Sequence, residues 1–327
     1  MKKKFSKVKW FDKELLTKQG EILLYQKNKN IGFVDNTWFH GERSLFFKPH
    51  YDNYISSPLG EIVYYYLSKE IGLNSLEVRP AYFITYNNEE IKNFNGSVSE
   101  SFIGTNQKLI LSCDFNKIGN SITETITSLK KYVQEMENLE SLPVECNYEE
   151  IEKDLKKVAL LDYLTLNKDR HKGNLGFLVT STDTAITVTL APVFDNAMIF
   201  YLNNNQQISY LSNCAAMKNF LSISDVLKTY LPLFTIKPVI DFEESNREFS
   251  KQVAGEIYIN KEYKSCFHCL KEISFDKIYS EIQKDIPNFK LEYRQFVMMQ
   301  AIFNNQVENI QNAVYQYNRK MRNEIQK

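Results

Sequence analysis

The alternation of hydrophobic and polar positions predicts a β-rich first third of the chain. Between residues 20 and 48, short β-favouring runs are separated by the polar stretches KNKN and HGER, and these runs read EILLYQ, NIGFVDNTWF and RSLFFK. An apolar helix is expected to open at Ser57 and to end at Gly72. The runs VRPAYFITYN and GSVSESFI then predict two more strands of the same sheet, joined by the polar turn NNEEIKNFN.

The rest of the chain is expected to be mostly helical. Ser121 and Glu124 form a capping-box sequence, and apolar residues follow at helical spacing. After a break at Pro143, a second helix carries Ile151, Leu155 and Val158 on one face. A polar loop and a short pair of strands should follow this helix. Further helical patterns cover residues 224–231, 275–286 and 291–320.

Polar side chains gather at the two ends of this loop-and-strand unit. The loop carries Asp169, Arg170, His171 and Asn174, and the second strand is expected to end at Asp195. One carboxylate can take a proton from a hydroxyl, while an amide and a second carboxylate can hold metal on phosphates. The five-residue step from Asp169 to Asn174 is that of the protein-kinase catalytic loop, and Asp195 follows Asp169 by 26 residues. The spacing therefore indicates a kinase.

The ungapped run N-K-D-R-H-K-G-N-L-G-F-L, with A-P-V-F-D after it, resembles the HipA and CtkA group of bacterial serine/threonine kinases. Phosphatidylinositol kinases share the D-R-H-x-x-N core. The resemblance implies an α+β, bilobal protein-kinase-like fold that uses ATP and Mg²⁺. Residues 1–103 would form an N-lobe with an antiparallel sheet and one main helix, and residues 104–327 a mostly helical C-lobe.

The resemblance also implies how the catalytic residues divide the work. Asp169 would orient the acceptor hydroxyl and accept its proton, Asn174 would ligate metal, and Asp195 would bridge the metals and the β- and γ-phosphates. Lys48 closes an apolar strand and would reach the α- and β-phosphates, held by Glu61, 13 residues later in the first turn of the helix. Each residue also has an ordinary role open to it, such as loop capping for Asp169, an Asx-turn for Asn174 or a helix-dipole contact for Glu61.

Adenine would be bound by backbone groups of the segment between the lobes, at Glu100, Ser101 and Phe102. The glycines Gly32 and Gly41 could belong to a phosphate-covering loop, but the chain has no G-x-G-x-x-G and an ordinary hairpin turn is the better interpretation.

Three further residues near the loop have less direct roles. Asp162 falls where an apolar residue is due on its helix, so we expect it to brace the catalytic loop, accepting from that loop's backbone amides. Arg170 and His171 fit a loop-structuring role as well as contact with the phosphates.

Composition excludes several other classes of protein. Lys plus Arg and Asp plus Glu number 40 each, so no basic field indicates a nucleic-acid partner or an anionic membrane. No secretory signal or membrane span is evident, and the five cysteines suit a reducing interior, so we expect a cytoplasmic protein, with export by a signal-free route left open. Cys266, His268 and Cys269 supply too few ligands for a closed zinc site, and packing is the better interpretation.

The segment after Asp195 bears on the substrate. Residues 196–217 contain no Lys, Arg, Asp or Glu, whereas a phosphoinositide kinase needs cations there. We therefore expect a protein substrate with a Ser or Thr acceptor. The resemblance adds autophosphorylation, with Ser44 as a candidate in an N-lobe loop, and a toxin or effector role with an antitoxin or regulatory partner. A lipid or small-molecule kinase, and a catalytically silent binding or scaffold module, are the alternatives.

Overall fold

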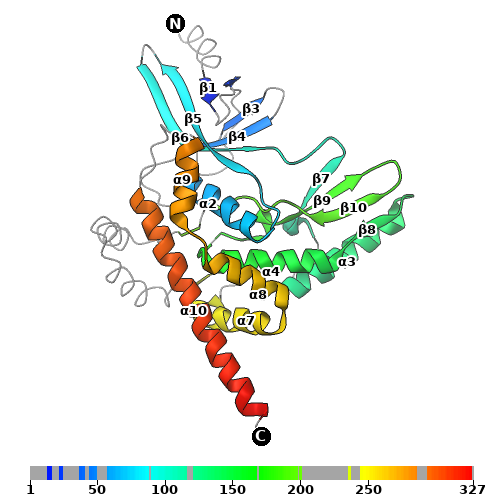
Figure 1. Cartoon of the computed structure of the whole chain (residues 1–327). Coiled ribbons are helices and arrows are strands. Elements are labelled where there is room, and N and C mark those ends of the chain that lie inside the picture. The colour runs from blue at the N-terminus through cyan, green and yellow to red at the C-terminus, as the bar shows by residue number, and fades with distance from the viewer. Residues whose placement is uncertain are drawn as a thin grey trace.

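The computed structural model describes residues 13–16, 22–24, 37–40, 44–49, 57–87, 90–115, 121–167, 169–197, 199–200, 235–236, 244–285 and 293–325. Within these residues, two main β-sheets and a group of helices form an α+β architecture (Figure 1). None of the described helices is both long and apolar enough to cross a bilayer.

The first sheet has six antiparallel strands in the order β2-β1-β5-β6-β4-β3. Its helix, α2 (Ser57–Glu70), packs against β5 and β6. The buried positions of α2 include Leu59, Ile62, Val63 and Leu67, whose spacing places them on one side of the helix. The strands are β1 (Lys13–Leu16), β2 (Ile22–Leu24), β3 (Thr37–His40), β4 (Ser44–Pro49), β5 (Val78–Asn87) and β6 (Glu90–Glu100).

The hairpin of β5 and β6 corrects one expectation. Strand β6 begins at Glu90, so most of the segment expected to be a turn is strand. β5 and β6 pair antiparallel from Val78 with Ser99 to Asn87 with Glu90. Cross-strand pairing, rather than local polarity, decides the structure of this segment. Strand β1 was not predicted either, because the patterned runs were taken to start after residue 20.

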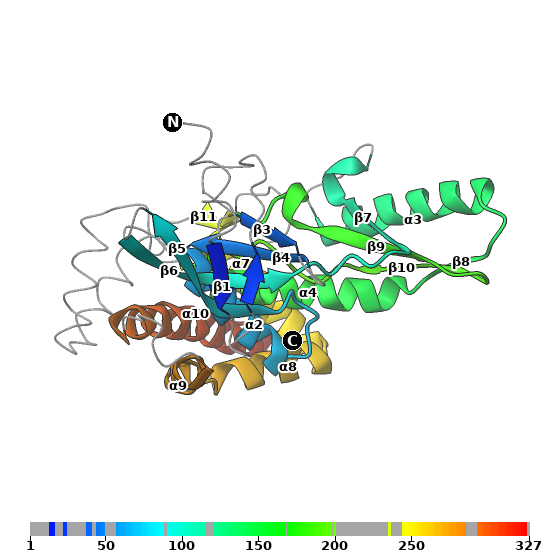
Figure 2. The ribbon, with the colours of Figure 1, turned by 90° about the horizontal axis from the view of Figure 1, so that it is seen from above.

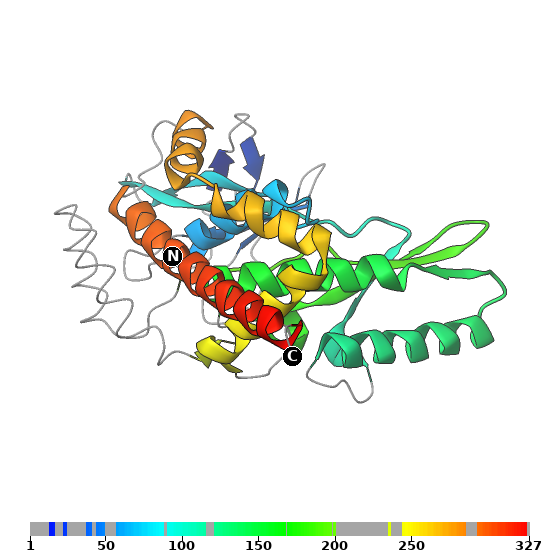
Figure 3. The same cartoon turned by 60° about the horizontal axis from the view of Figure 1, so that its bottom comes forward.

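The second sheet has the order β7-β9-β10-β8, and only the pair of β8 with β10 is parallel. Its strands are β7 (Gln107–Leu111), β8 (Val144–Cys146), β9 (Gly176–Ser181) and β10 (Ile186–Leu190). Helix α3 (Ile122–Leu139) starts as predicted, because Oγ of Ser121 accepts a hydrogen bond from the Glu124 amide at 3.2 Å. This sheet and α3 extend to one side of the body (Figure 2, Figure 3).

Helix α4 (Tyr148–Leu164) runs through the middle of the molecule (Figure 3). It carries Ile151, Leu155 and Val158 on its buried face, as predicted. The C-terminal helices α7 (Asn246–Ile259), α8 (Lys261–Lys271), α9 (Phe275–Asp285) and α10 (Tyr293–Ile325) follow the short strands β11 (Thr235–Ile236) and β12 (Glu244–Ser245). Helix α10 packs on α7, α9 and α4, and one hydrophobic core joins α2, α4 and α10.

Two predictions about the C-terminal third can be placed on these helices. α9 and α10 account for the patterns at residues 275–286 and 291–320, while the helix expected at 224–231 lies outside the described residues. In α8, Cys266 is buried, and His268 and Cys269 are exposed. Burial against the core accounts for Cys266 as ordinary packing.

Candidate active site

Lys48 joins the first sheet to the loop that carries Asp195. Its Nζ lies 2.6 Å from Oε1 of Glu61 and 2.9 Å from Oδ1 of Asp195. The predicted ion pair of Lys48 with Glu61 is therefore present, with side chains that are 14% and 7% exposed. One expectation about Glu61 is wrong: α2 has no acidic residue in its first turn, because Glu61 is the fifth residue of the helix. A contact with the helix dipole therefore does not explain Glu61.

The charges of this trio are set by burial and by mutual attraction. Burial raises the pKa of Glu61, and Lys48 offsets part of that effect. Burial alone would lower the pKa of Lys48, but the carboxylates of Glu61 and Asp195 outweigh it, and the pKa lies above its ordinary value. Burial would likewise raise the pKa of Asp195, but Lys48 outweighs it and the pKa is lowered. At neutral pH, Lys48 is a cation and Asp195 an anion.

The polar loop brings Asp169 and Asn174 into direct contact. The side-chain nitrogen of Asn174 donates to the backbone oxygen of Asp169 at 2.8 Å and lies 3.5 Å from its Oδ2. Oδ1 of Asn167 accepts from the backbone amide of Asp169 at 3.0 Å, and Nδ1 of His171 accepts from the Gly173 amide at 3.0 Å. These bonds fix the loop from inside, and they give His171 the loop-structuring role.

Asp195 lies in a loop rather than at the end of a strand, which corrects the expectation. Strand β10 ends at Leu190, and Asp195 follows five residues later with a left-handed φ of +54°. The segment before it is held to the chain after α2, because the Val193 amide donates to the Asn74 oxygen and the Val193 oxygen accepts from the Leu76 amide. A non-glycine residue in this conformation needs support from its surroundings.

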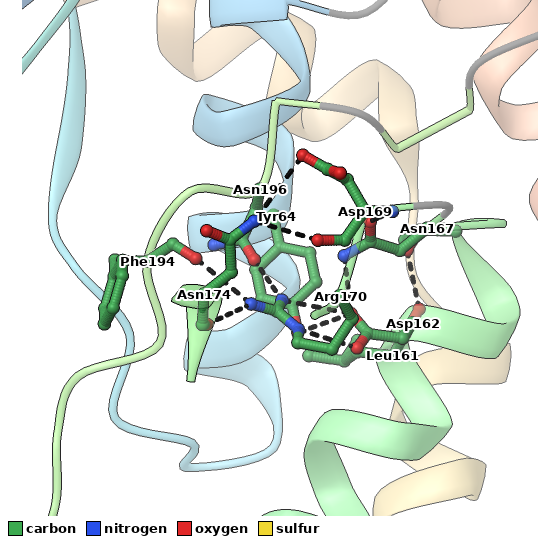
Figure 4. A network of polar contacts seen from close by, with 10 residues as sticks. Tyr64, Leu161, Asp162, Asn167, Asp169, Arg170, Asn174, Phe194 and Asn196 are labelled. Atoms are coloured by element: carbon green, nitrogen blue, oxygen red, sulfur yellow. Dashed lines mark hydrogen bonds and ion pairs between the residues drawn. The ribbon is translucent and has the colours of Figure 1, made fainter. Parts of the chain in front are cut away.

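Arg170 supplies that support from a fully buried position (Figure 4). One terminal nitrogen, Nη1, donates to the backbone oxygens of Asn174 at 2.8 Å and Phe194 at 3.1 Å. The other, Nη2, donates to Oδ1 of Asn196. Arg170 therefore hydrogen-bonds to Asn174 and to Phe194 and Asn196 on either side of Asp195. These bonds hold the two candidate metal ligands, Asn174 and Asp195, close together.

Asp162 balances the buried guanidinium and braces the loop, as expected. Its carboxylate accepts from Nε of Arg170 at 2.9 Å and from Nη2 at 3.2 Å. It also accepts from Nδ2 of Asn167 at 2.9 Å and from the hydroxyl of Tyr64 at 3.2 Å. The donors are thus side chains rather than the loop's backbone amides, as Figure 4 shows.

The sequence did not predict several residues of this network. Tyr64 comes from α2, Asn167 and Phe194 belong to the runs that carry the resemblance but were given no role, and Asn196 directly follows Asp195. The available signals were weak: Asn167 and Asn196 are polar residues beside apolar runs, and Tyr64 stands in an apolar helix, three residues after Glu61. Nothing in the sequence says that Tyr64 meets Asp162.

The segment between the two sheets contains the residues expected to face adenine. Glu100 ends β6, while Ser101 and Phe102 lie outside any helix or strand. The Phe102 ring stacks on Phe194, with centroids 5.8 Å apart and an interplanar angle of 28°. Contact of the segment with adenine remains a prediction. Gly32 and Gly41 lie outside the described residues.

The donor set at the site suits a magnesium nucleotide. Because the nitrogen of Asn174 is used within the loop, its amide oxygen is the atom left to bind a cation. Oδ1 of Asp195 contacts Lys48, and the Asp195 side chain is 44% exposed. Amide and carboxylate oxygens are the ligands that Mg²⁺ prefers, and two protein ligands plus phosphate oxygens are typical of its nucleotide sites.

Comparison with known proteins establishes the fold. No family model and no curated protein matches the chain. The chain is similar to the crystal structure of the Helicobacter pylori proinflammatory kinase CtkA, with a TM-score of 0.59 and 17% sequence identity. The match covers 89% of this chain and 95% of that one. The α+β, bilobal protein-kinase-like fold expected from the sequence is thereby confirmed.

Proposed function

We propose that this protein is an ATP-dependent kinase that phosphorylates seryl or threonyl groups of proteins. The observation that carries the proposal is the double ion pair of Lys48, which joins Glu61 of α2 to Asp195 beside the Asp169–Asn174 loop. The shared fold with the proinflammatory kinase CtkA supports it. The structural basis is thus a cation and three oxygen-bearing groups gathered at one place.

Each residue then has a definite task. The Asp169 carboxylate, 44% exposed, orients the acceptor hydroxyl and takes its proton. The hydroxyl oxygen bonds to the γ-phosphorus, and the bond from that phosphorus to the β–γ bridging oxygen breaks, giving ADP and a phosphomonoester. Lys48, held as a cation by Glu61, binds the α- and β-phosphates.

Metal and nucleotide positions follow from the same groups. The oxygens of Asn174 and Asp195 would hold Mg²⁺, which neutralises phosphate charge when bound. The backbone of Glu100, Ser101 and Phe102 would bind adenine, with residues 1–103 covering the nucleotide and residues 104–327 carrying the loop. Arg170 does not reach phosphate in this proposal, because its guanidinium hydrogen-bonds to Asp162, Asn174, Phe194 and Asn196 in the interior of the protein.

A neutral acceptor is favoured over an anionic lipid headgroup. The stretch from 196 to 217 lacks any Lys or Arg that could hold a phosphorylated headgroup. Its structure lies mostly outside the described residues, so this support comes from the sequence. A protein seryl or threonyl group, including one of the chain's own, fits this segment best.

The test is phosphoryl transfer from γ-labelled ATP with Mg²⁺. The wild-type protein should label protein seryl or threonyl groups, while Asp169→Asn should bind nucleotide with similar affinity and label nothing. Site mapping will show whether Ser44, the first residue of β4, is a target; it is paired with His40 in the sheet. Label found only in lipid or a metabolite would support that class of kinase instead, and failure to bind nucleotide would leave a scaffold.

A further inference from the structure

A groove of about 700 Å³ lies between α3 and the second sheet. These elements form the part of the molecule that extends from the body (Figure 3). No residue of the candidate active site lines it. Helix α3 contributes Tyr132, Glu135, Met136 and Leu139, at helical i, i+3 and i+4 spacing, and its C-cap residue Glu140 follows them. The groove is large enough for a ligand of several residues.

The opposite wall is a strand edge and a sheet face. Four consecutive residues, 105–108, border the groove: 105 and 106 form the turn before β7, and Gln107 and Lys108 begin that strand. β7 is an outer strand of its sheet and pairs only with β9 among the described strands. From the sheet face, Val179 and Ile186 add apolar surface. An outer strand offers an edge at which an extended chain can pair.

The groove is acidic although the chain as a whole is neutral. Its charged lining residues are Glu135, Glu140 and Asp183 against Lys108 alone. Among the described residues, none of these four takes part in an ion pair. Leu139, at the end of α3, is 84% exposed, and Met136 is an adaptable apolar contact. The lining therefore combines uncompensated negative charge with exposed apolar surface.

We propose that this groove docks an extended, Lys- or Arg-containing segment with apolar anchor residues, carried by the protein substrate. This inference rests on the proposed kinase function. Strand β9 connects the candidate active site to the groove: it begins at Gly176, two residues after Asn174, and first lines the groove at Val179. Three residue steps in a strand span about 10 Å. An acceptor hydroxyl at Asp169 must then be at least about three extended residues away from the docked segment.

Binding is tested first, without phosphoryl transfer. The probe is a fluorescent peptide of eight residues with three Lys or Arg and two Leu, and without Ser, Thr or Tyr. Wild-type protein should bind it with an affinity that falls as salt rises. The variant Glu135→Lys, Glu140→Lys, Asp183→Lys should bind at least about tenfold more weakly. The matched control Glu70→Lys, Glu77→Lys, Glu308→Lys reverses three exposed charges elsewhere and should bind like wild type. Equal loss, or no loss, in both variants overturns the docking groove.

Tethered substrates then test the assignment to the substrate. An acceptor Ser is joined to the probe by a Gly-Ala spacer of two or ten residues. In wild type and the control variant, KM for the long-spacer substrate should be at least about tenfold lower than KM for the short-spacer substrate. In the groove variant the two KM values should be equal. Equal KM values for both spacers in wild type overturn the substrate assignment. Residues 1–9 carry five lysines. If deletion of this segment makes the probe bind more tightly, the segment itself occupies the groove, and the assignment to the substrate is overturned. Probe binding without any phosphoryl transfer refutes the kinase function and not the groove.

Discussion

The substitution Asp162→Asn tests whether a buried charge pair holds the candidate active site together. Both Asp162 and Arg170 have fully buried side chains. The carboxylate accepts four hydrogen bonds on two oxygens, three of them on Oδ1. Asparagine keeps one acceptor oxygen and replaces the other with an NH₂ group. That group must face a donor, and the guanidinium loses its only buried counter-charge among the described residues.

Removing one member of a buried pair costs about 3–5 kcal/mol, because the remaining charge stays out of water. For a chain of 327 residues this corresponds to a fall in Tm of roughly 4–7 °C. The matched control is Asp154→Asn on the same helix. Asp154 pairs with Lys157 at 3.0 Å, but this pair is partly exposed and should contribute less than about 1 kcal/mol.

The assay is thermal denaturation of both variants, followed by phosphoryl transfer below the melting range. A third protein, Asp162→Leu with Arg170→Met, separates stability from positioning. An apolar pair should recover much of the lost Tm. Activity should not recover, because the bonds from Arg170 to the backbone of Asn174 and Phe194 are gone. Equal falls in Tm for Asp162→Asn and Asp154→Asn would refute the stabilising role of the buried pair. Full activity of the double variant would refute the positioning role of Arg170.

Three further substitutions have definite expectations. Lys48→Met removes the cation that offsets the raised pKa of Glu61. A carboxyl whose folded pKa exceeds its unfolded value makes the protein less stable as pH rises. Above the folded pKa that Glu61 has in the wild type, itself raised above 4.5, denaturation should therefore show the variant losing up to about 1.4 kcal/mol per pH unit relative to wild type. Adding Glu61→Gln should reduce this pH dependence to the share of Asp195, whose pKa also rises without Lys48, and an unreduced dependence would contradict the assignment. Gly96→Ala should lower stability by about 1–3 kcal/mol and weaken nucleotide binding, since its Cβ would collide with the backbone oxygen of Lys48; an unchanged Kd for nucleotide would refute this. Ser121→Ala should cost about 1 kcal/mol in urea denaturation by removing the helix cap, and Ser121→Thr, which keeps the hydroxyl, should cost less.

The elements that the sequence predicted well are those fixed by short-range patterns. Helix α3 has its capping residue and its apolar stripe, and the pairing of Lys48 with Glu61 followed from motif order rather than from contacts. Strand β6 was misjudged because its first half is polar and owes its structure to a neighbouring strand. Local propensity carries no information about such pairing.

The interior of the site was the least predictable part. Arg170 was left between two roles because an arginine in a polar loop is ordinarily exposed. Its burial depends on Asp162, eight residues earlier, and on the Asp195 segment, more than twenty residues later. The contact of Tyr64 with Asp162 spans 98 residues. Residues so far apart in the sequence come into contact only in the complete fold, so no local sequence pattern predicts their contacts.

The long-range contact of Tyr64 with Asp162 also limits how the protein can be divided into fragments. The Tyr64 hydroxyl belongs to a helix of the first sheet, yet it completes the surroundings of a carboxylate in the other half of the chain. A recombinant fragment that begins after Phe102, between the two sheets, would lack Tyr64. Its Asp162 would then miss one hydrogen-bond donor in the interior, next to the guanidinium of Arg170. The two halves are therefore poor modules for swapping between homologues, and a transplanted catalytic half would have to bring α2 along with it.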